Sequence, residues 1–215
     1  MVKSDLALGD FVAAVVSADI TEVTRLLAAS PELARARFQV GATRATAKAY
    51  YLDQIGRYIY AGDTALHLAA ASYQTALVQT LIDGGADVHA RNRLGQQPIH
   101  GAAVGLPGSR AWNPSSQAAT ILCLIEAGAD PNAADKRGVS PLHRAVRTRC
   151  ARAVQTLLES GADPRLQTKS GSTPMLLAIQ STGRGGSGSP EAKLEQEEIV
   201  RLLRQTLLAP TPSEQ

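Results

Sequence analysis

Three histidines recur at a spacing that suggests a metal site at first sight. His67, His100 and His143 are separated by 33 and then 43 residues. If this spacing is the period of a helical repeat, it places them in adjacent layers roughly 10 Å apart, the packing distance of neighbouring helices. The ligands of one zinc ion must all lie about 2 Å from it, so these histidines cannot share a metal. We therefore expect a structural role for each histidine and no bound metal or cofactor.

The remaining chemically active residue types do not form a catalytic set. Cys123 lies within an apolar run and is expected to be a buried core residue. Cys150 is expected to be structural as well, although a low-pKa thiol is an alternative because Arg147, Arg149 and Arg152 are close in sequence. Neither thiol has a histidine and acidic partner in a recognisable pattern, so we expect no catalysis.

A glycine-rich stretch at 183–189 resembles a phosphate loop only in composition. The phosphate loop has the pattern G-x-x-x-x-G-K-[ST] between a strand and a helix. Here Gly188 is followed by Ser189 and Pro190, with no lysine. The stretch from 181 to 190 is instead typical of a flexible linker.

A repeated phrase surrounds the histidines and identifies the architecture. Its four copies begin 33, 43 and 33 residues apart, and they read Thr64-Ala65-Leu66-His67, Gln97-Pro98-Ile99-His100, Ser140-Pro141-Leu142-His143 and Thr173-Pro174-Met175-Leu176. A period of 33 residues with the core T-P-L-H-x-A is typical of the ankyrin repeat. The chain therefore resembles the ankyrin-repeat family. The resemblance implies an all-α solenoid of helix-turn-helix repeats with short hairpin fingers, and it implies that the recurring histidine bonds backbone groups between repeats.

The repeat pattern predicts a single domain of about five repeats, including degenerate caps. The expected boundaries are 5–37 for the N-terminal cap repeat, 38–61 for a tyrosine-rich insertion, 62–94, 95–137 and 138–170 for full repeats, 171–209 for the C-terminal cap repeat, and 210–215 for a tail. Terminal repeats have one face toward water, so they are expected to depart from the pattern. Accordingly, Phe11 stands in place of Leu66, and Leu176 replaces the histidine, which removes its hydrogen bond.

Further detail of the repeats is also predictable. We expect helices at 75–83, 98–104 and 117–127, with Gly84-Gly85 ending the first of these. The segment 105–114 is rich in glycine and proline and is expected to be a loop. Trp112, the only tryptophan, is expected to fold back onto the helices.

The tyrosine-rich insertion allows two interpretations. Tyr51, Ile55 and Tyr58 fall at helical spacing, although Gly56 weakens a helix. The first interpretation is a short helix that covers the cap, with its rings packed as core. The second is a set of tyrosines presented to a partner, because tyrosine brings a large contact area at little entropy cost.

Basic residues concentrate on the expected fingers. The finger tips contain one acidic residue, Asp135, and six basic residues, which are Arg91, Arg93, Lys136, Arg137, Arg165 and Lys169. Arg144, Arg147 and Arg149 add to the same side. The family resemblance implies that fingers and first helices line a concave surface. Either this edge is simply solvated, or it attracts an acidic partner.

Composition limits the remaining possibilities. Apolar residues make up 44% of the 215 residues and aromatics 4%, which suits thin layers of Ala, Leu and Val. No run of about 18 apolar residues predicts a membrane span. The net charge of +3 is too small to argue for nucleic acid by itself. Two cysteines are too few for a disulfide framework, and free thiols fit a reducing compartment, so we expect the cytoplasm. We also expect a monomer.

Together these observations predict a non-catalytic protein-protein interaction module that binds a partner, with an acidic segment, on its concave face. The expected partner-binding residues are Tyr50, Tyr51, Tyr58, Tyr60, Arg91, Arg93, Lys136, Arg137, Arg144 and Arg147. One alternative is a small-molecule or enzymatic site at the insertion, in a pocket with Tyr58, Tyr60 and Asp63. A second alternative is nucleic-acid binding through the fingers.

Overall fold

The computed structural model describes residues 3–105, 112–180 and 190–209. Within these ranges the structure is almost entirely helical. The α-helices are α1 (Lys3–Val16), α2 (Ile20–Ala29), α3 (Ala65–Ala71), α4 (Thr75–Asp83), α5 (Pro98–Ala102), α6 (Pro114–Glu126), α7 (Pro141–Arg147), α8 (Ala151–Glu159), α9 (Pro174–Ile179) and α10 (Pro190–Leu208). Two 3₁₀ helices, η1 (Pro31–Arg35) and η2 (Ala47–Tyr50), and two short strands, β1 (Tyr51–Leu52) and β2 (Arg57–Tyr58), lie between α2 and α3.

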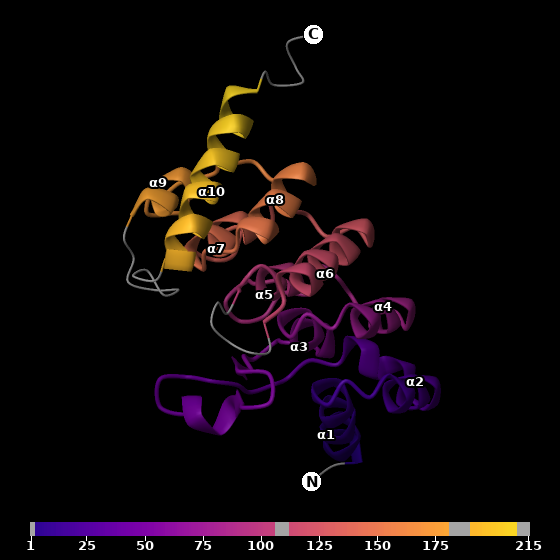
Figure 1. Ribbon diagram of the computed structural model, residues 1–215. Helices are drawn as coiled ribbons and strands as arrows, with labels where there is room; N and C mark the ends of the chain where they lie inside the picture. The colour runs from indigo at the N-terminus through magenta and orange to yellow at the C-terminus, as the bar shows by residue number, and fades with distance from the viewer. Residues whose placement is uncertain (1–2, 106–111, 181–189, 210–215) are drawn as a thin grey trace.

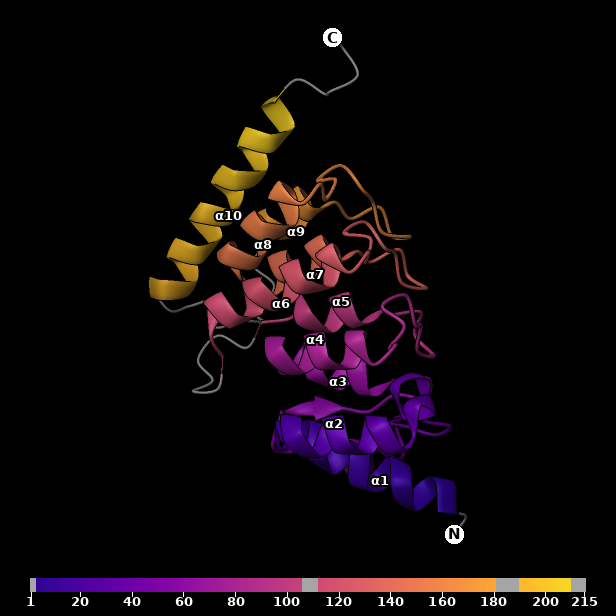
Figure 2. The same cartoon turned by 90° about the vertical axis from the view of Figure 1, so that its right-hand side faces the viewer.

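Successive helix pairs stack on one another from the N-terminus to the C-terminus (Figure 1). The first helix of each pair packs on the first helix of the next pair, as α3 does on α5 and α7 on α9. The second helix likewise packs on the next second helix, as α6 does on α8. The loops between pairs project together along one edge (Figure 2). The predicted all-α ankyrin solenoid is therefore confirmed.

Local sequence fixes where these short helices begin. Pro98, Pro141 and Pro174 occupy the first turns of α5, α7 and α9, where a missing N–H costs nothing. At α7 the Ser140 hydroxyl accepts a hydrogen bond from the N–H of His143, which satisfies one of the free donors of the first turn. Gly85, with φ of +91°, follows α4 in the left-handed conformation expected for that glycine.

The core is a continuous layer of aliphatic residues along the stack. The first helices contribute Leu66, Ile99 and Leu142, all with no exposed surface. The second helices repeat a stripe of apolar residues, which are Val78, Leu81, Ile121, Leu124, Val154, Leu157, Ile199 and Leu203. In the first pair Phe11 is fully buried. Each such side chain stabilises the fold by about 1.5–3 kcal/mol through burial.

The expectation of a helix at the tyrosine-rich insertion is wrong. The segment forms an antiparallel hairpin in which Tyr51 pairs with Tyr58 and Leu52 with Arg57. Gly56 has φ of +62°, a conformation that belongs to a tight turn and not to a helix. The insertion projects on the side of α3, α5 and α7 (Figure 1).

Two further predictions differ in detail. Helix α6 begins at Pro114, three residues before the expected start, because Asn113 caps it by accepting hydrogen bonds from the N–H groups of Ser115 and Ser116. Helix α5 ends at Ala102, two residues before the expected end. Residues 106–111, 181–189 and 210–215, which include most of the two expected loops and the tail, lie outside the described residues. In the part of the chain that the structure describes, no helix is long and apolar enough to cross a bilayer.

Candidate functional site

The three recurring histidines link consecutive helix pairs. Nε2 lies 3.0 Å from the carbonyl oxygen of Gln96 in His67, 3.1 Å from that of Val139 in His100, and 3.0 Å from that of Ser172 in His143. Each carbonyl belongs to the loop that leads into the next pair. These contacts are the backbone bonds between repeats that the sequence predicted.

The tautomer of these histidines follows from the second ring nitrogen. In His67, Nδ1 accepts a hydrogen bond from the backbone N–H of Thr64 at 3.1 Å, so the proton resides on Nε2 and is donated to the next loop. A second proton at Nδ1 would oppose that backbone N–H. Burial lowers the pKa of His67, and it lowers the pKa of His100 to about 4. The rings are therefore neutral at physiological pH.

Arg57 fastens the hairpin to the first helices. Its guanidinium donates to the carbonyl oxygen of Val104 at 2.8 Å, to the carbonyl oxygen of Ala71 at 3.3 Å and to the hydroxyl of Tyr73 at 3.1 Å. The Tyr73 hydroxyl in turn donates to the carbonyl of Val104. These bonds hold the hairpin beside the ends of α3 and α5.

A second junction holds the base of the insertion against the first finger, the loop at residues 86–94. The carboxylate of Asp63 accepts a hydrogen bond from the N–H of Tyr60 at 2.6 Å and another from the Asn92 amide at 2.8 Å. Burial raises the pKa of Asp63, although His67 and these donors oppose the rise. Arg93 donates to the carbonyl of Ala42, and its guanidinium carbon lies 5.3 Å from the centre of the Tyr60 ring, within cation-π range.

Between the hairpin and the first helices lies a pocket of about 340 Å³, which we call the hairpin pocket. Polar side chains line much of it, among them Arg57, Tyr58, Tyr60, Asp63, Gln96 and Arg144. Its apolar wall comes from Leu68, Leu94 and Val104. The structure thus brings to one pocket Tyr58, Tyr60 and Asp63, the three residues of the alternative hypothesis of a small-molecule site.

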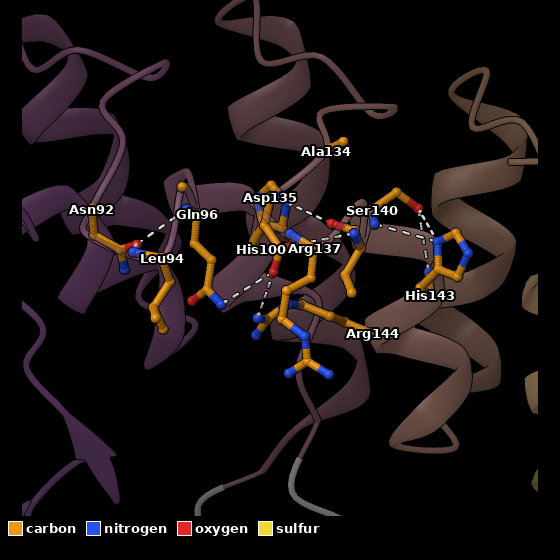
Figure 3. Close-up of polar contacts among 12 residues, drawn as sticks. Asn92, Leu94, Gln96, His100, Ala134, Asp135, Arg137, Ser140, His143 and Arg144 are labelled. Carbon is orange, nitrogen blue, oxygen red and sulfur yellow. Dashed lines mark hydrogen bonds and ion pairs between the residues drawn. The ribbon is translucent and has the colours of Figure 1, made fainter. Parts of the chain in front are cut away.

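Arg144, on α7, faces Asp135 and Gln96 (Figure 3). The closest nitrogen of Arg144 lies 3.7 Å from the Asp135 carboxylate, and Gln96 donates to the same carboxylate at 3.5 Å. Burial alone would raise the pKa of Asp135, but the N–H groups of Val139 and Arg137, with the Arg144 guanidinium and the Gln96 amide, more than offset this effect, so the pKa is lowered. Asp135 is therefore a carboxylate held mainly by its own finger.

The basic finger residues divide into two groups. Arg91 donates to the carbonyl oxygens of Gly95 and Ala134, both at 2.8 Å, so its guanidinium builds the fingers. In contrast, Lys136 and Arg137 are exposed, and within the described part of the chain their side chains make no hydrogen bond or ion pair. Arg91 and Arg93 differ from these two residues because their guanidinium groups donate to backbone carbonyls.

The tyrosines also separate. Tyr51 and Tyr58 are 40% and 44% exposed, and their ring centres lie 4.8 Å apart. These two rings are not core residues, contrary to the first interpretation of the insertion. Tyr50 is half-buried and packs against the core, as that interpretation expects. Tyr60 is half-buried in the hairpin pocket.

Trp112 and the two cysteines, which were expected to be structural, are half-buried or buried. Trp112 is half-buried against the core, and its Nε1 donates to the Gln117 amide oxygen at 2.9 Å. Cys123 is buried, as expected, and burial raises its pKa. Burial also raises the pKa of the Cys150 thiol to about 11, so the alternative of a low-pKa thiol is wrong.

Sequence reasoning missed two residues of this site. Arg57 and Gln96 carry no motif of their own, because their roles depend on carbonyl and carboxylate oxygens far along the chain. Only the hairpin pairing of Leu52 with Arg57 brings Arg57 over the helix ends, and that pairing was not predicted.

Comparisons with known families agree with the geometry. A family model described as "Ankyrin repeat" matches residues 61–93, and a model described as "Ankyrin repeats (many copies)" matches residues 124–178. A search of curated proteins found no match to the chain.

Proposed function

Because this chain is an ankyrin-repeat protein, we propose that it is a non-catalytic interaction module that binds an acidic segment of a protein partner on its concave face. Ankyrin repeats are generally protein-protein interaction modules. The proposed surface runs from the hairpin at one end, along the first helices, to the tips of the fingers.

The observation that carries this proposal is the pair of uncommitted cations at the second finger. Lys136 and Arg137 are exposed, and among the described residues their side chains make no hydrogen bond or ion pair. No ion pair or hydrogen bond to the described residues has to break before these side chains pair with an acidic residue of a partner. They would raise the association rate with an acidic segment at low salt.

The exposed tyrosine pair supplies the second support. Tyr51 and Tyr58 expose large rings already held against each other at the hairpin, which the Arg57 bonds fix in place. Tyrosines of this kind are enriched among the residues that dominate binding energy. We propose that they contact the apolar residues of the bound segment.

The test is affinity capture from cell lysate with the full chain, read by mass spectrometry at two salt concentrations. The test variant is Lys136→Glu with Arg137→Glu, which spares the structural bonds of Arg91 and Arg93. The control is Arg152→Glu with Arg204→Glu, which changes the net charge equally at exposed residues of the second helices α8 and α10.

We expect a protein captured by the wild type and the control to be lost in the test variant and weakened at the higher salt. Equal loss in both variants would reject a specific surface. Capture that disappears on nuclease treatment would favour nucleic-acid binding through the fingers, whose affinity falls steeply with salt.

A small-molecule site is the second candidate, favoured by the hairpin pocket. At about 340 Å³ it lies near the lower end of the usual range of about 300–1,000 Å³ for ligand pockets. Thermal stabilisation of the wild type by a metabolite, lost on substitution of Tyr60 by Ala but kept in the Lys136→Glu, Arg137→Glu variant, would support this candidate over the first.

A further inference from the structure

We propose that the hairpin pocket receives a single carboxylate side chain, glutamate or aspartate, of the bound partner segment, with Arg144 as its main receptor and Arg57 beside it. This inference rests on the proposed function and adds the residue-level position at which the acidic segment is recognised.

The state of Arg144 is the first argument. Its Nε is buried and has no hydrogen-bond acceptor, and its closest approach to the Asp135 carboxylate is 3.7 Å, longer than the usual 2.7–3.2 Å of a hydrogen bond. A buried guanidinium donor without an acceptor is costly. Arg144 lines the pocket with a side chain that is 21% exposed, so a carboxylate there can pair with the terminal guanidinium nitrogens, and the planar fork of arginine suits two parallel hydrogen bonds to one carboxylate.

The charge around Arg144 is the second argument. Arg57 and Arg147 are close enough to lower the pKa of Arg144 by repulsion, in addition to the larger effect of burial and against the attraction of Asp135. The two carboxylates nearby, Asp63 and Asp135, already accept hydrogen bonds from their own loops. Among the charged side chains that line the pocket, Arg57 and Arg144 are cations and Asp63 is an anion, which leaves one positive charge in excess.

The same balance selects the charge of the occupant. One added negative charge would neutralise the excess of one positive charge in this cluster. A dianionic phosphate would bring more charge close to Asp63 and Asp135, and like charges repel strongly in a partly buried site. The cluster therefore favours a carboxylate over a phosphate.

The volume of the pocket, about 340 Å³, accommodates one side chain with its adjoining backbone. The Tyr58 ring and the apolar side chains of Leu94 and Val104 form walls that can contact the methylene groups of a glutamate. The pocket opens on the face that carries the first helices and fingers, so a peptide lying along that face can place one side chain in it.

The experiment uses arginine Nε–H signals of the full chain in ¹H–¹⁵N NMR spectra. The probe is N-acetyl-L-glutamate α-amide, which carries one side-chain carboxylate and no other charge. Its matched control is N-acetyl-L-glutamine α-amide, which has the same shape without the charge. Arg144→Lys assigns the Arg144 signal, and Arg137→Gln is the control for a finger arginine outside the pocket.

We expect the glutamate probe to shift the Arg144 signal saturably, with a dissociation constant on the order of 1 mM. We expect no such shift with the glutamine probe, an unchanged response in Arg137→Gln, and a weakened response of the other pocket signals in Arg144→Lys, which keeps the charge but loses the fork. An equal response to the glutamine probe, or no response of Arg144, would overturn the inference. Saturation by inorganic phosphate at a much lower concentration would also overturn it, in favour of a free anion as ligand.

The capture experiment and the NMR titration together separate this inference from the proposed function. If a captured protein depends on Lys136 and Arg137 while Arg144 ignores the glutamate probe, the pocket inference fails and the interaction function stands. If Arg144 binds the probe while no protein depends on the fingers, the interaction function fails and the pocket remains a carboxylate site.

Discussion

The guanidinium of Arg57 and the carbonyl oxygen of Val104 form a hydrogen bond of 2.8 Å between positions 47 residues apart. This bond joins the inserted hairpin to the end of α5, beyond the helix pair that follows the insertion directly. The position of the hairpin therefore depends on the helices, although its sequence interrupts the repeat pattern.

Replacing Arg57 with Ala should loosen the hairpin. The variant loses three hydrogen bonds in a half-buried place, each worth about 0.5–1.5 kcal/mol, so we expect a loss of about 1–3 kcal/mol in local stability. Hydrogen exchange at the Ile59 amide, which donates to the carbonyl of Tyr50, should become faster. Arg44→Ala, at an exposed arginine of the same insertion, should leave that exchange rate unchanged, and an equal rate in both variants would contradict the role of Arg57.

Gly62 and Gly85 allow backbone strain to be separated from steric clash. Both have positive φ, +85° and +91°, so alanine at either position should cost about 1 kcal/mol or more. A methyl group at Gly62 would lie 2.9 Å from the Asn92 Cα, whereas at Gly85 it would meet nothing within 4 Å. We expect Gly62→Ala to lower the unfolding midpoint in urea more than Gly85→Ala, and equal effects would show that the finger yields without cost.

Replacing His100 with Gln should reduce the loss of stability in mild acid. Burial lowers the pKa of His100 to about 4, below the value of about 6.5 in an unfolded chain. As pH falls from about 6.5 toward 4, the unfolded chain takes up a proton that the folded protein does not, and stability falls by up to about 1.4 kcal/mol per pH unit.

The measurement is urea unfolding of wild type and His100→Gln from pH 4.5 to 7.5. The difference in unfolding free energy between the two should be largest at pH 7.5 and shrink as pH falls. The raised pKa of Asp63 acts in the opposite direction, but it is common to both proteins and largely cancels in the difference. Parallel curves would contradict the lowered pKa of His100.

Gln117 should be a stability determinant of the second full repeat. It is fully buried, donates to the carbonyl of Ala102 at 2.9 Å and accepts from the Trp112 indole at 2.9 Å. In Gln117→Leu both partners lose their bond, at about 1–3 kcal/mol for each buried group left unsatisfied. In this variant, fluorescence of the single tryptophan should shift to the red before global unfolding. The control is Gln155→Leu, on the exposed face of α8, which should change stability by no more than about 0.5 kcal/mol and leave the emission unchanged.

The regular part of this fold was predictable because each repeat contains its own instructions. The spacing of His67, His100 and His143 follows the period of the repeat, and the resemblance to the ankyrin-repeat family implied the bonds that these histidines make between repeats. The helix at 75–83 was predicted to the residue because a polar turn precedes it and two glycines follow it.

The hairpin and the site were less predictable. Tyr51 and Tyr58 stand seven residues apart, a spacing that fits two helical turns as well as a pair of facing strand residues. Only the turn at Gly56, with its positive φ, decides between them. The division of the finger arginines was not predicted, although Arg91 and Arg137 occupy different positions of the repeat: Arg91 precedes Asn92, whereas Arg137 lies two residues after Asp135, which makes the same turn.

The hairpin is held by arginine side chains that bond backbone carbonyls, those of Ala71 and Val104 for Arg57 and that of Ala42 for Arg93. A carbonyl is present whatever side chain the residue carries. Mutations can therefore change the side chains that line the groove without removing the acceptors that position the hairpin. This separation makes the hairpin a candidate for grafting onto other helical repeats that offer backbone carbonyls in the same positions.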